Sequence, residues 1–376
     1  MMNNLGPVIV PSNVKIIAIT GGPCGGKTEI IPIVREELEN CGVHVITIPE
    51  LATEFCSNGM ACGRHLLINE FERQLLMSQI ERELACVRAA AKMPFPRIVI
   101  LTDRGRLDVK AYVDQSFKKM VEEIGYDEAK LCDFYSAVFH LQSLSVEFPD
   151  KYDLFCKNNI HRRENAAEAK AVDQKTMLSW LAHPHLRVVS SSGKNGELIN
   201  LREKAHRLLE EICSVLGIPV PLEIEKKYLV SDFPDIPVPY EVIDITQFYT
   251  RIGNTGEERY RSRSYHGGTT YCQTLKNDVS IGVREELNLP ISKEQYEIAK
   301  MKILPGSIMI TKRRFVFIWE NQYFEFDVFQ EKMSGLFILE IELTKECDAV
   351  KLPPFINVIK EVTDDASYYN RTLAFV

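Results

Sequence analysis

The pattern of apolar and polar positions differs between the two halves of the chain. From residue 14 to about residue 215, short β-branched runs alternate with longer stretches that carry apolar residues at helical spacing. The runs "VKIIAIT", "HVITIP", "RIVILTD" and residues 186–190 predict strands, whereas 27–40, 69–91 and 200–216 predict helices. Strands that alternate with helices are typical of a parallel sheet with helices on both faces.

The second half contains short segments in which charged and apolar residues alternate, such as "LEIEKKYLV", "EERYRSRSY", "QYFEFDVF" and "LFILEIEL". Breaks such as "HGG" and "LPGS" separate several of them, and this pattern predicts an antiparallel sheet or barrel. The prolines of "GIPVPL" end the last helix of the first half. We therefore expect a flexible tail over 1–13, an α/β domain over 14–215, a linker over 216–221 and an antiparallel β-barrel over 222–376.

Composition narrows the function classes. A length of 376 residues favours two domains, and 45 basic against 52 acidic residues give a net charge of −7, which argues against general nucleic-acid binding. No apolar run approaches the roughly 18 residues of a membrane-spanning helix, and the first residues lack the pattern of a signal peptide. The ten cysteines form no CxxC pair. We therefore expect no transmembrane segment, reduced thiols and a cytoplasmic location.

A glycine-rich stretch, "GGPCGGKT", follows the first predicted strand and precedes the first predicted helix. It fits G-x-x-x-x-G-K-[ST], whose backbone N–H groups converge on phosphate oxygens. Lys27 is placed to reach the terminal phosphates, and the Thr28 hydroxyl to bind Mg²⁺. The predicted nucleotide-binding residues of this loop are Gly21, Gly22, Gly25, Gly26, Lys27 and Thr28.

Other candidates come from the ends of the next strands, because ligands of open parallel sheets bind beyond the carboxyl ends of the strands. Asp103 could hold the water shell of Mg²⁺, accept a proton from a substrate hydroxyl, or cap a helix, a part that Asp108 could also play. Glu50 is a candidate against the alternative of a solvated strand end. Arg104 lies close enough to touch phosphate. Arg162 and Arg163 are candidates for a lid over the phosphates, against the alternative of a solvated face.

Charged side chains in the second half alternate along the predicted strands, so each set projects to one face. The first set is Glu223, Glu225 and Lys227. The others are Arg259, Arg261, Arg263, Lys276, Lys312, Arg314, Glu325, Asp327, Glu340 and Glu342. A solvated sheet surface would explain this pattern, and so would a closed barrel with a charged lumen.

In the closed barrel, each sign of charge has a task. Carboxylates suit Mg²⁺ or Mn²⁺, and we predict a metal site from Glu223, Glu225, Glu325, Asp327, Glu340 and Glu342. Lysine and arginine side chains suit linear phosphates and would stabilise charge that develops on a leaving group. The predicted catalytic set comprises the lysines and arginines of the preceding paragraph, Glu223, Glu225 and Asp103.

Each half also resembles a known family. "GGPCGGKT", "PELATEF", "LTDRGRLDVKAY" and "RRENAAEAKAVDQKTMLSWLAHPHLRVV" resemble the P-loop ATPase-like domain related to nicotinamide riboside kinases. This resemblance implies ATP or GTP binding, with NTPase or small-molecule kinase activity as further options, and it places Arg104 and the arginines of the lid at the nucleotide. Glu223-Ile-Glu225-Lys-Lys227 and the late "LEIEL" resemble the CYTH, or triphosphate tunnel metalloenzyme, superfamily.

The order of the two halves resembles the translocation-defect family of eukaryotic proteins, named for TRPL trafficking, in which a P-loop domain precedes a CYTH domain. Two hypotheses follow. In the first, the protein is a metal-dependent enzyme that cleaves inorganic, thiamine or nucleoside triphosphate. In the second, it is a nucleotide-binding regulator of membrane trafficking whose tunnel recognises a phosphoinositide head group without catalysis. Acidic residues beside the basic ones favour the enzyme, because an anion binder has no need of them.

Overall fold

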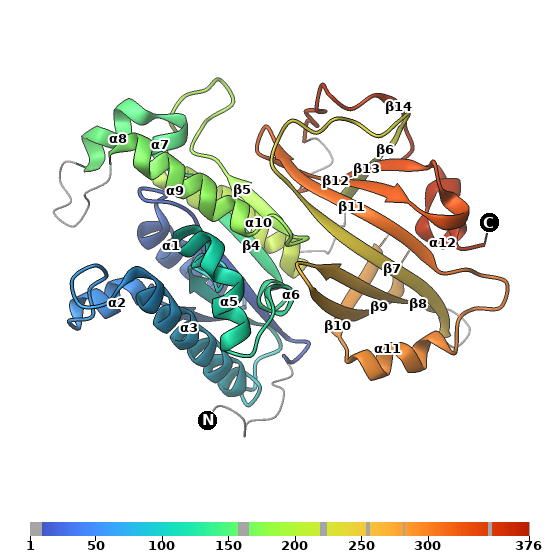
Figure 1. Cartoon of the computed structure of the whole chain (residues 1–376), viewed down its shortest axis with the longest axis horizontal. Helices are drawn as coiled ribbons and strands as arrows, with labels where there is room; N and C mark the ends of the chain where they lie inside the picture. Colours follow the sequence, from blue (N-terminus) through green and yellow to red (C-terminus); the bar gives the residue numbers. More distant parts are fainter. Residues whose placement is uncertain are drawn as a thin grey trace. The chain divides into compact units, whose positions relative to one another are not determined.

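The computed structural model describes residues 10–156, 165–218, 224–252, 256–280, 283–344 and 348–375. Only the backbone is described for residues 114, 153, 155–156, 251–252, 256–257, 275–280 and 283–287. The chain divides into two compact units, Met1–Ile212 and Cys213–Val376, which we treat separately (Figure 1). The predicted boundaries of the tail, domains and linker stay predictions.

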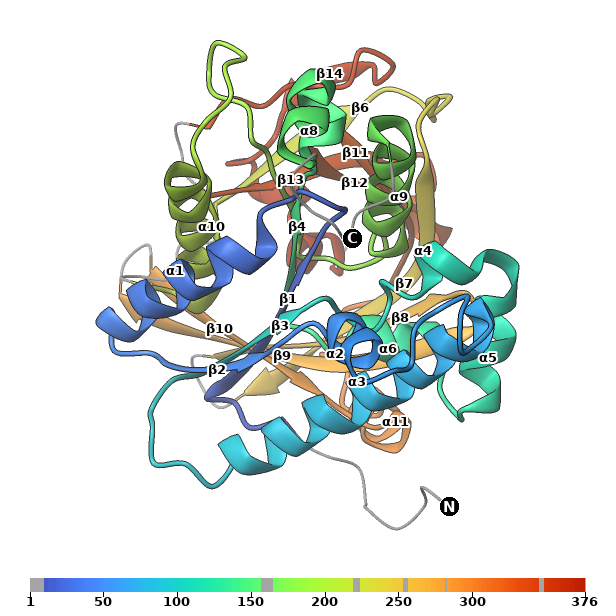
Figure 2. The same cartoon turned by 90° about the vertical axis from the view of Figure 1, so that its left-hand side faces the viewer.

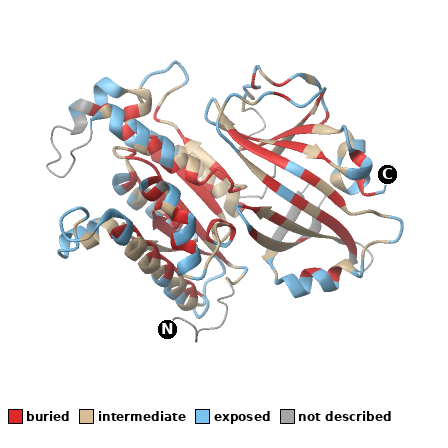
Figure 3. Ribbon diagram, viewed as in Figure 1, coloured by how far each residue is buried: buried red, intermediate tan, exposed pale blue. Residues whose placement is uncertain are grey.

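The first unit is built on a parallel sheet of five strands in the order β2-β3-β1-β4-β5. The strands are β1 (Val14–Thr20), β2 (His44–Ile48), β3 (Ile98–Asp103), β4 (Ala137–Leu141) and β5 (Leu186–Val189). Every residue of β3 and β4 is buried, as expected of strands covered on both faces (Figure 3). The predicted parallel sheet is therefore confirmed.

Helices cover both faces of this sheet, with α1 and α10 on one side and α3 on the other (Figure 2). The helices are α1 (Lys27–Asn40), α2 (Leu51–Ser57), α3 (Ile68–Ala90), α4 (Lys110–Val113), α5 (Phe117–Glu123), α6 (Glu128–Cys132), α7 (Leu144–Glu147), α8 (Pro149–Cys156), α9 (Ala166–Ser179) and α10 (Leu201–Leu216). A short 3₁₀ turn spans Asp114–Ser116. Helix α9 begins with a capping box, in which Asn165 accepts from the backbone N–H of Glu168 and Glu168 accepts from that of Asn165.

The second unit contains a nine-stranded sheet in the order β10-β9-β8-β7-β11-β12-β13-β6-β14, and all of its pairings are antiparallel. The strands are β6 (Ile224–Val230), β7 (Tyr240–Ile252), β8 (Gly256–Tyr265), β9 (Gly268–Ser280), β10 (Val283–Pro290), β11 (Ile310–Trp319), β12 (Gln322–Phe329), β13 (Phe337–Leu343) and β14 (Val358–Glu361). The antiparallel sheet was predicted. Its closure into a barrel is not shown, because among the described residues β10 pairs only with β9 and β14 only with β6.

The remaining elements of this unit are two helices, α11 (Lys293–Lys300) and α12 (Asn370–Leu373), and two 3₁₀ turns, Glu331–Met333 and Ala366–Tyr368. One face of the sheet is apolar, with a cluster that includes Phe315, Phe317, Phe324, Phe326 and Leu339. The alternation of strand side chains puts the charged residues of β11, β12 and β13 on the other face.

A second apolar cluster lies at one end of the charged face. Ile310, Phe329 and Ile338 continue the charged side of their strands and pack with Leu373 of α12. The charged face is therefore closed at this end by side chains of its own strands and by the last helix. No helix in the described parts of either unit is long and apolar enough to cross a membrane.

Candidate functional sites

The glycine-rich loop joins β1 to α1 in the predicted strand-loop-helix context. Gly21 and Gly26 have φ of 139° and 87°, values that side chains disfavour. A Cβ on Gly21 would lie 2.3 Å from the carbonyl oxygen of Leu141, so the loop passes directly against the end of β4. Glycine is needed here for both the backbone angle and the close approach.

Lys27 lies in the first turn of α1 and is buried. Its Nζ donates to the carbonyl oxygens of Gly21 at 2.7 Å and Gly22 at 3.2 Å, so the ammonium group folds back on its own loop. Burial and then the charge of Arg104 lower the pKa of Lys27. An anionic phosphate would relieve both effects. Thr28, the predicted Mg²⁺ ligand, is exposed at the same end of the helix.

The ends of β2 and β3 bring the other predicted residues of the first unit together. Arg104 Nε donates to Glu50 Oε1 at 2.5 Å, and Arg104 also lies 3.4 Å from Asp108. This ion pair holds the pKa of Glu50 down at about 2 against the opposing effect of burial. Glu50 is the N-cap residue of α2 and is not part of β2, which ends at Ile48. The solvated strand end that we considered for Glu50 is therefore wrong.

Asp103 ends β3 and is buried. Its Oδ1 makes no hydrogen bond among the described residues, and burial raises its pKa to about 6. The helix-cap alternative is wrong for Asp103, because the next helix begins only at Lys110. Asp108 does not act as a cap through its side chain either. Its carboxylate accepts from Thr20 Oγ1 at 2.7 Å and from Trp180 Nε1 at 2.6 Å.

Two buried residues behind the loop were not predicted. Asp173 of α9 accepts from the backbone N–H of Gly22 at 2.8 Å and of Ser143 at 3.0 Å, and its other oxygen lies 3.1 Å from His140 Nε2. Lys204 of α10 donates to the carbonyl oxygens of Gly25 at 3.0 Å and Gln142 at 2.8 Å, and to Ser191 Oγ. Both hold the loop through its main chain.

The charged face of the second unit extends from β6 to β8, with the apolar residues Ile243 and Ile245 of β7 between the charges of β11 and those of β8. Strand pairing sets Lys227 opposite Glu340, Glu340 opposite Glu325, and Arg314 opposite Asp327. The same registers set Glu225 opposite Glu342, Lys312 opposite Ile245, and Ile245 opposite Arg263. Paired residues of antiparallel strands point to the same side, so the charges that we predicted to share faces of single strands share one face of the sheet.

The central part of this face is buried. Only 0 to 7% of the surface of Asp327, Lys312, Glu340, Arg314 and Arg263 is accessible. A sheet face open to water would leave such long side chains exposed, so the solvated surface that we considered is wrong.

Ion pairs neutralise the acidic part of the face. Lys227 Nζ lies 2.7 Å from Glu225 and 2.6 Å from Glu340, and Arg314 contacts Glu340 at 2.8 Å. Asp327 accepts from both Lys312 and Arg314. Burial opposes ionisation of Glu340, but the charges of Lys227, Lys312 and Arg314 hold its pKa below the usual value. Glu340 therefore stays ionised at neutral pH.

The basic part of the face lies on β8. Burial and then the neighbouring charge of Arg259 lower the pKa of Arg261 to about 10, with a further contribution from Arg263. The buried Nε of Arg261 has no hydrogen-bond partner among the residues described. Like charges crowded in a buried place are costly unless an anion joins them, so this part of the face suits a phosphate chain.

The chemistry of the carboxylates allows a test of the predicted metal site. Glu225 and Glu342 lie opposite each other on β6 and β13, next to Glu340, and hard divalent cations prefer such oxygen ligands. Asp327 does not fit a metal, because both of its oxygens accept from buried cationic groups, and Glu325 bonds Arg314. Within the described parts of the chain, no three acidic, histidine or cysteine side chains form a ready metal site.

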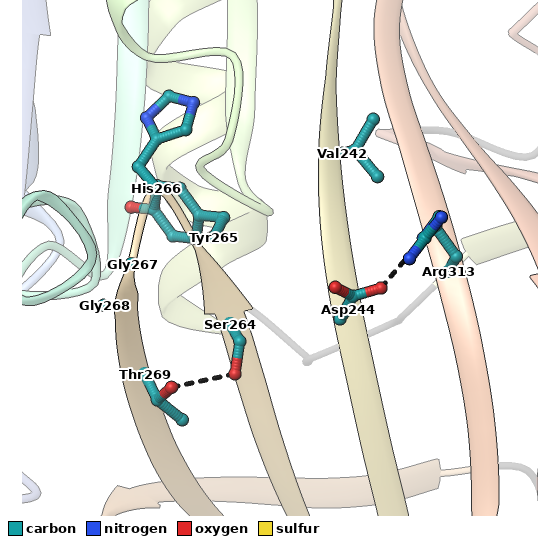
Figure 4. A pocket seen from close by; sticks show the side chains of 9 residues that line it. All are labelled: Val242, Asp244, Ser264, Tyr265, His266, Gly267, Gly268, Thr269 and Arg313. Carbon is teal, nitrogen blue, oxygen red and sulfur yellow. Dashed lines mark hydrogen bonds and ion pairs between the residues drawn. The ribbon is translucent and has the colours of Figure 1, made fainter.

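The side chains of four predicted site residues are not described by the structure. Arg162, Arg163 and Glu223 lie outside the described residues, and only the backbone of Lys276, on β9, is described. A pocket of about 340 Å³ at the β8–β9 hairpin, lined among others by Asp244, His266 and Arg313, lies on the face opposite the charged one (Figure 4). It contains none of the predicted site residues.

Comparison with known proteins bears on each half. Residues 16–197 match the model of the AAA domain. An inorganic triphosphatase of Nitrosomonas europaea is 32% identical over 155 residues, which are 40% of this chain and 96% of that protein. The chain belongs to the family of this triphosphatase. The fusion of the two parts in one translocation-defect family is not confirmed by these comparisons.

Two solved structures are also similar to parts of the chain. The crystal structure of an inorganic triphosphatase is 32% identical, and the match covers 41% of this chain and 95% of the other, with a TM-score of 0.32. A thymidylate kinase from Ehrlichia chaffeensis is 14% identical, and its match covers 53% of this chain and 99% of the other, with a TM-score of 0.33. The match to the AAA domain and the triphosphatase relative together give a P-loop nucleotide-binding domain and homology to a triphosphatase in one chain.

Proposed function

We propose that the second unit hydrolyses a linear triphosphate on its charged face, with the sheet curved into a tunnel around it. The observation that carries this proposal is the burial of both signs of charge on one face, where Glu340 of β13 and Asp327 of β12 lie with Lys312 and Arg314 of β11 and Arg263 of β8. A linear polyphosphate is long enough to contact both parts at once. The name of the relative favours hydrolysis over the alternative of recognition alone.

Each group has a distinct part in this reaction. Arg259, Arg261 and Arg263 bind the phosphates and stabilise the charge that develops on the leaving phosphate. Lys312 and Arg314 are fixed by Asp327 and extend this basic surface toward the carboxylates. Because these side chains are held before substrate arrives, little reorganisation is needed when the phosphorus–oxygen bond breaks.

Glu225 and Glu342, together with Glu223, would hold Mg²⁺ or Mn²⁺, whereas both oxygens of Glu340 already accept from Lys227 and Arg314. When bound, the metal neutralises phosphate charge and helps to generate the attacking hydroxide. Lys227, which now bridges Glu225 and Glu340, keeps these carboxylates compensated before substrate and metal enter. We assign Asp327 and Glu325 to the support of the basic side chains and leave them out of the metal site.

The first unit binds ATP or GTP at residues 21–28, with the amine of Lys27 moving from the carbonyls of Gly21 and Gly22 to the terminal phosphates. Thr28 would contribute to Mg²⁺ binding there. Arg104 lies near the same edge through its ion pair with Glu50, and the lid role of Arg162 and Arg163 remains part of this proposal.

The test is release of phosphate by the full chain from inorganic triphosphate, thiamine triphosphate, ATP and GTP, each with Mg²⁺ and with Mn²⁺. We expect hydrolysis of at least inorganic triphosphate, and the same rate in Lys27→Ala, because the P-loop is not part of the tunnel. A wild-type protein inert toward the whole panel would refute the proposal. Loss of inorganic triphosphate hydrolysis in Lys27→Ala would place the reaction in the first unit and contradict the proposal.

A further inference from the structure

Strand β7 contributes an uncharged polar side chain, Gln247, to the charged face of the second unit. The strand registers set Gln247 opposite Arg261 of β8 on one side and opposite Ile310 of β11 on the other. Because paired residues of antiparallel strands point to the same side, the amide of Gln247 lies on the face that carries the arginines. Gln247 is 0% exposed, so this amide is fully removed from bulk water.

One end of the amide is hydrogen-bonded, and the other is not. Nε2 of Gln247 donates at 3.2 Å to the hydroxyl of Tyr249, which lies two residues further along the strand and on the same face. Oε1 of Gln247 is buried and has no hydrogen-bond partner among the described residues. A buried acceptor without a donor is costly, and native proteins rarely contain one. The amide oxygen is therefore available to a donor that turns toward it.

The residue opposite Gln247 has the complementary property. The buried Nε of Arg261 also lacks a hydrogen-bond partner in the part of the chain that the structure describes. Cβ atoms of opposed residues in antiparallel strands lie about 4.5 to 5.5 Å apart, so a change of rotamer can bring a glutamine amide to an arginine Nε. An unpaired acceptor on β7 and an unpaired donor on β8 thus stand opposite each other.

The cations of the charged face are supported in two different ways. Lys227 of β6 and Lys312 and Arg314 of β11 each contact a carboxylate, which offsets their charge. On β8, by contrast, Nη2 of Arg259 donates at 3.3 Å to the hydroxyl oxygen of Thr274, which is uncharged. A neutral acceptor can orient a guanidinium group and leave its full charge for an anion, whereas a carboxylate competes with the anion. The amide of Gln247 is an acceptor of the neutral kind.

We propose that Gln247 is a positioning residue of the triphosphate site, whose amide oxygen accepts a hydrogen bond from Nε of Arg261 when phosphate binds. This inference rests on the proposed function of the second unit. The two terminal nitrogens of the guanidinium group contact the phosphate, and the Nε–H, which lies outside that pair, turns to Gln247. Arg261 is then fixed in the orientation that a bidentate contact with phosphate requires, and its charge is not cancelled.

The experiment compares three variants of the full chain. Gln247→Met keeps the length of the side chain and removes the acceptor, whereas Gln247→Glu keeps an acceptor of the same shape and adds a negative charge. The control, Gln273→Met, makes the first change on the opposite face of the same sheet, where the amide of Gln273 donates to Glu258. Binding of inorganic triphosphate is titrated without metal, and kcat and KM for its hydrolysis are measured with Mg²⁺. Gln247→Met is also combined with Arg261→Lys in a double-mutant cycle.

We expect Gln247→Met to weaken metal-free binding of triphosphate about tenfold and to raise KM by a similar factor, with a smaller change in kcat, because the lost hydrogen bond orients a charged group that binds the substrate. Gln247→Glu should bind triphosphate more weakly still, since its carboxylate would neutralise Arg261. Gln273→Met should bind as the wild type does. In the Arg261→Lys background, Gln247→Met should change the affinity less than twofold, because the guanidinium group that it positions is absent.

Three results for Gln247→Met would each overturn the proposal: unchanged binding, a loss that Gln273→Met reproduces, or the full tenfold loss in the Arg261→Lys background. Gln247→Glu decides the matter if Gln247→Met fails to fold, since binding as tight as that of the wild type would show that no charge is reserved for phosphate at Arg261. Absence of triphosphate binding by the wild type would instead contradict the proposed function of the second unit.

Discussion

Asp327→Asn tests whether the buried ion pairs organise the charged face. The substitution keeps the size of the side chain but removes the charge that compensates Lys312 and Arg314. Strand β11 offers a matched control at the adjacent residue, because Arg313 pairs at 3.0 Å with Asp244 on the opposite face of the sheet. The change Asp244→Asn removes the same charge from a pair that joins β7 to β11, whereas the ion pairs of Asp327 join β12 to β11.

Burial sets the expected difference between the two variants. Asp327 is 0% exposed, and loss of one partner of a buried ion pair costs about 3 to 5 kcal/mol, because the remaining charges stay desolvated. The side chains of Arg313 and Asp244 are 49% and 60% exposed, and such pairs contribute about 0 to 1 kcal/mol. Asp327→Asn should therefore lower the free energy of unfolding of the second unit by at least about 2 kcal/mol more than Asp244→Asn.

The assay is urea unfolding of the full chain in a Trp180→Phe background, so that Trp319 reports on the second unit alone. Phosphate release from inorganic triphosphate is measured in parallel, and it should fall in Asp327→Asn as Lys312 and Arg314 lose their positions. Equal unfolding free energies for the two variants would refute the reasoning. If Asp327→Asn were as stable as its parent, the charged face would be hydrated, and our account of it as an enclosed site would fail.

Three further predictions concern single groups. Lys27→Ala should weaken ATP or GTP binding about tenfold or more through loss of a charge-assisted contact, and unchanged affinity in a titration would contradict the assignment of the loop. Glu225→Gln should lower metal-dependent triphosphate hydrolysis by about 100-fold, while binding of triphosphate without metal persists; equal loss of both would show that Glu225 serves the fold instead. The pKa of Asp103 is raised to about 6, so the folded state binds the proton of this carboxyl group more tightly than the unfolded state does. The contribution of Asp103 to the free energy of unfolding is therefore lost as the pH rises from about 4 to 6. Asp103→Asn should therefore raise the free energy of unfolding at pH 7 by up to about 3 kcal/mol and change it little at pH 4, and denaturant titrations at the two pH values that show the same effect would contradict this.

Local patterns in the sequence predicted the features that depend on neighbouring residues. The glycine-rich loop was recognisable because strand, loop and helix follow one another, and the charges of β8 were placed on one face because strand side chains alternate. Strand β4 was missed, since "AVFHL" is short and has no glycine or proline boundary before it. Sequence spacing gave no signal for Asp173 or Lys204, because their contacts with Gly22 and Gly25 span 151 and 179 residues. The ion pairs of Asp327 depend in the same way on the register between strands. The sequence therefore suggested Asp327 as a metal ligand, whereas in the structure its carboxylate binds the side chains of Lys312 and Arg314.

The contacts that fix the P-loop also determine which of its residues can be replaced in evolution. Asp173 and Lys204 bond the main chain of the loop, through the N–H of Gly22 and the carbonyl of Gly25. Main-chain groups are the same whatever side chain a residue carries, so these contacts would survive replacement of Pro23 by another residue. The glycines have no such freedom, because a Cβ on Gly25 would lie 2.6 Å from the carbonyl oxygen of Leu141. Evolution could therefore vary the interior of this loop while its glycines and its two distant anchors stay under selection.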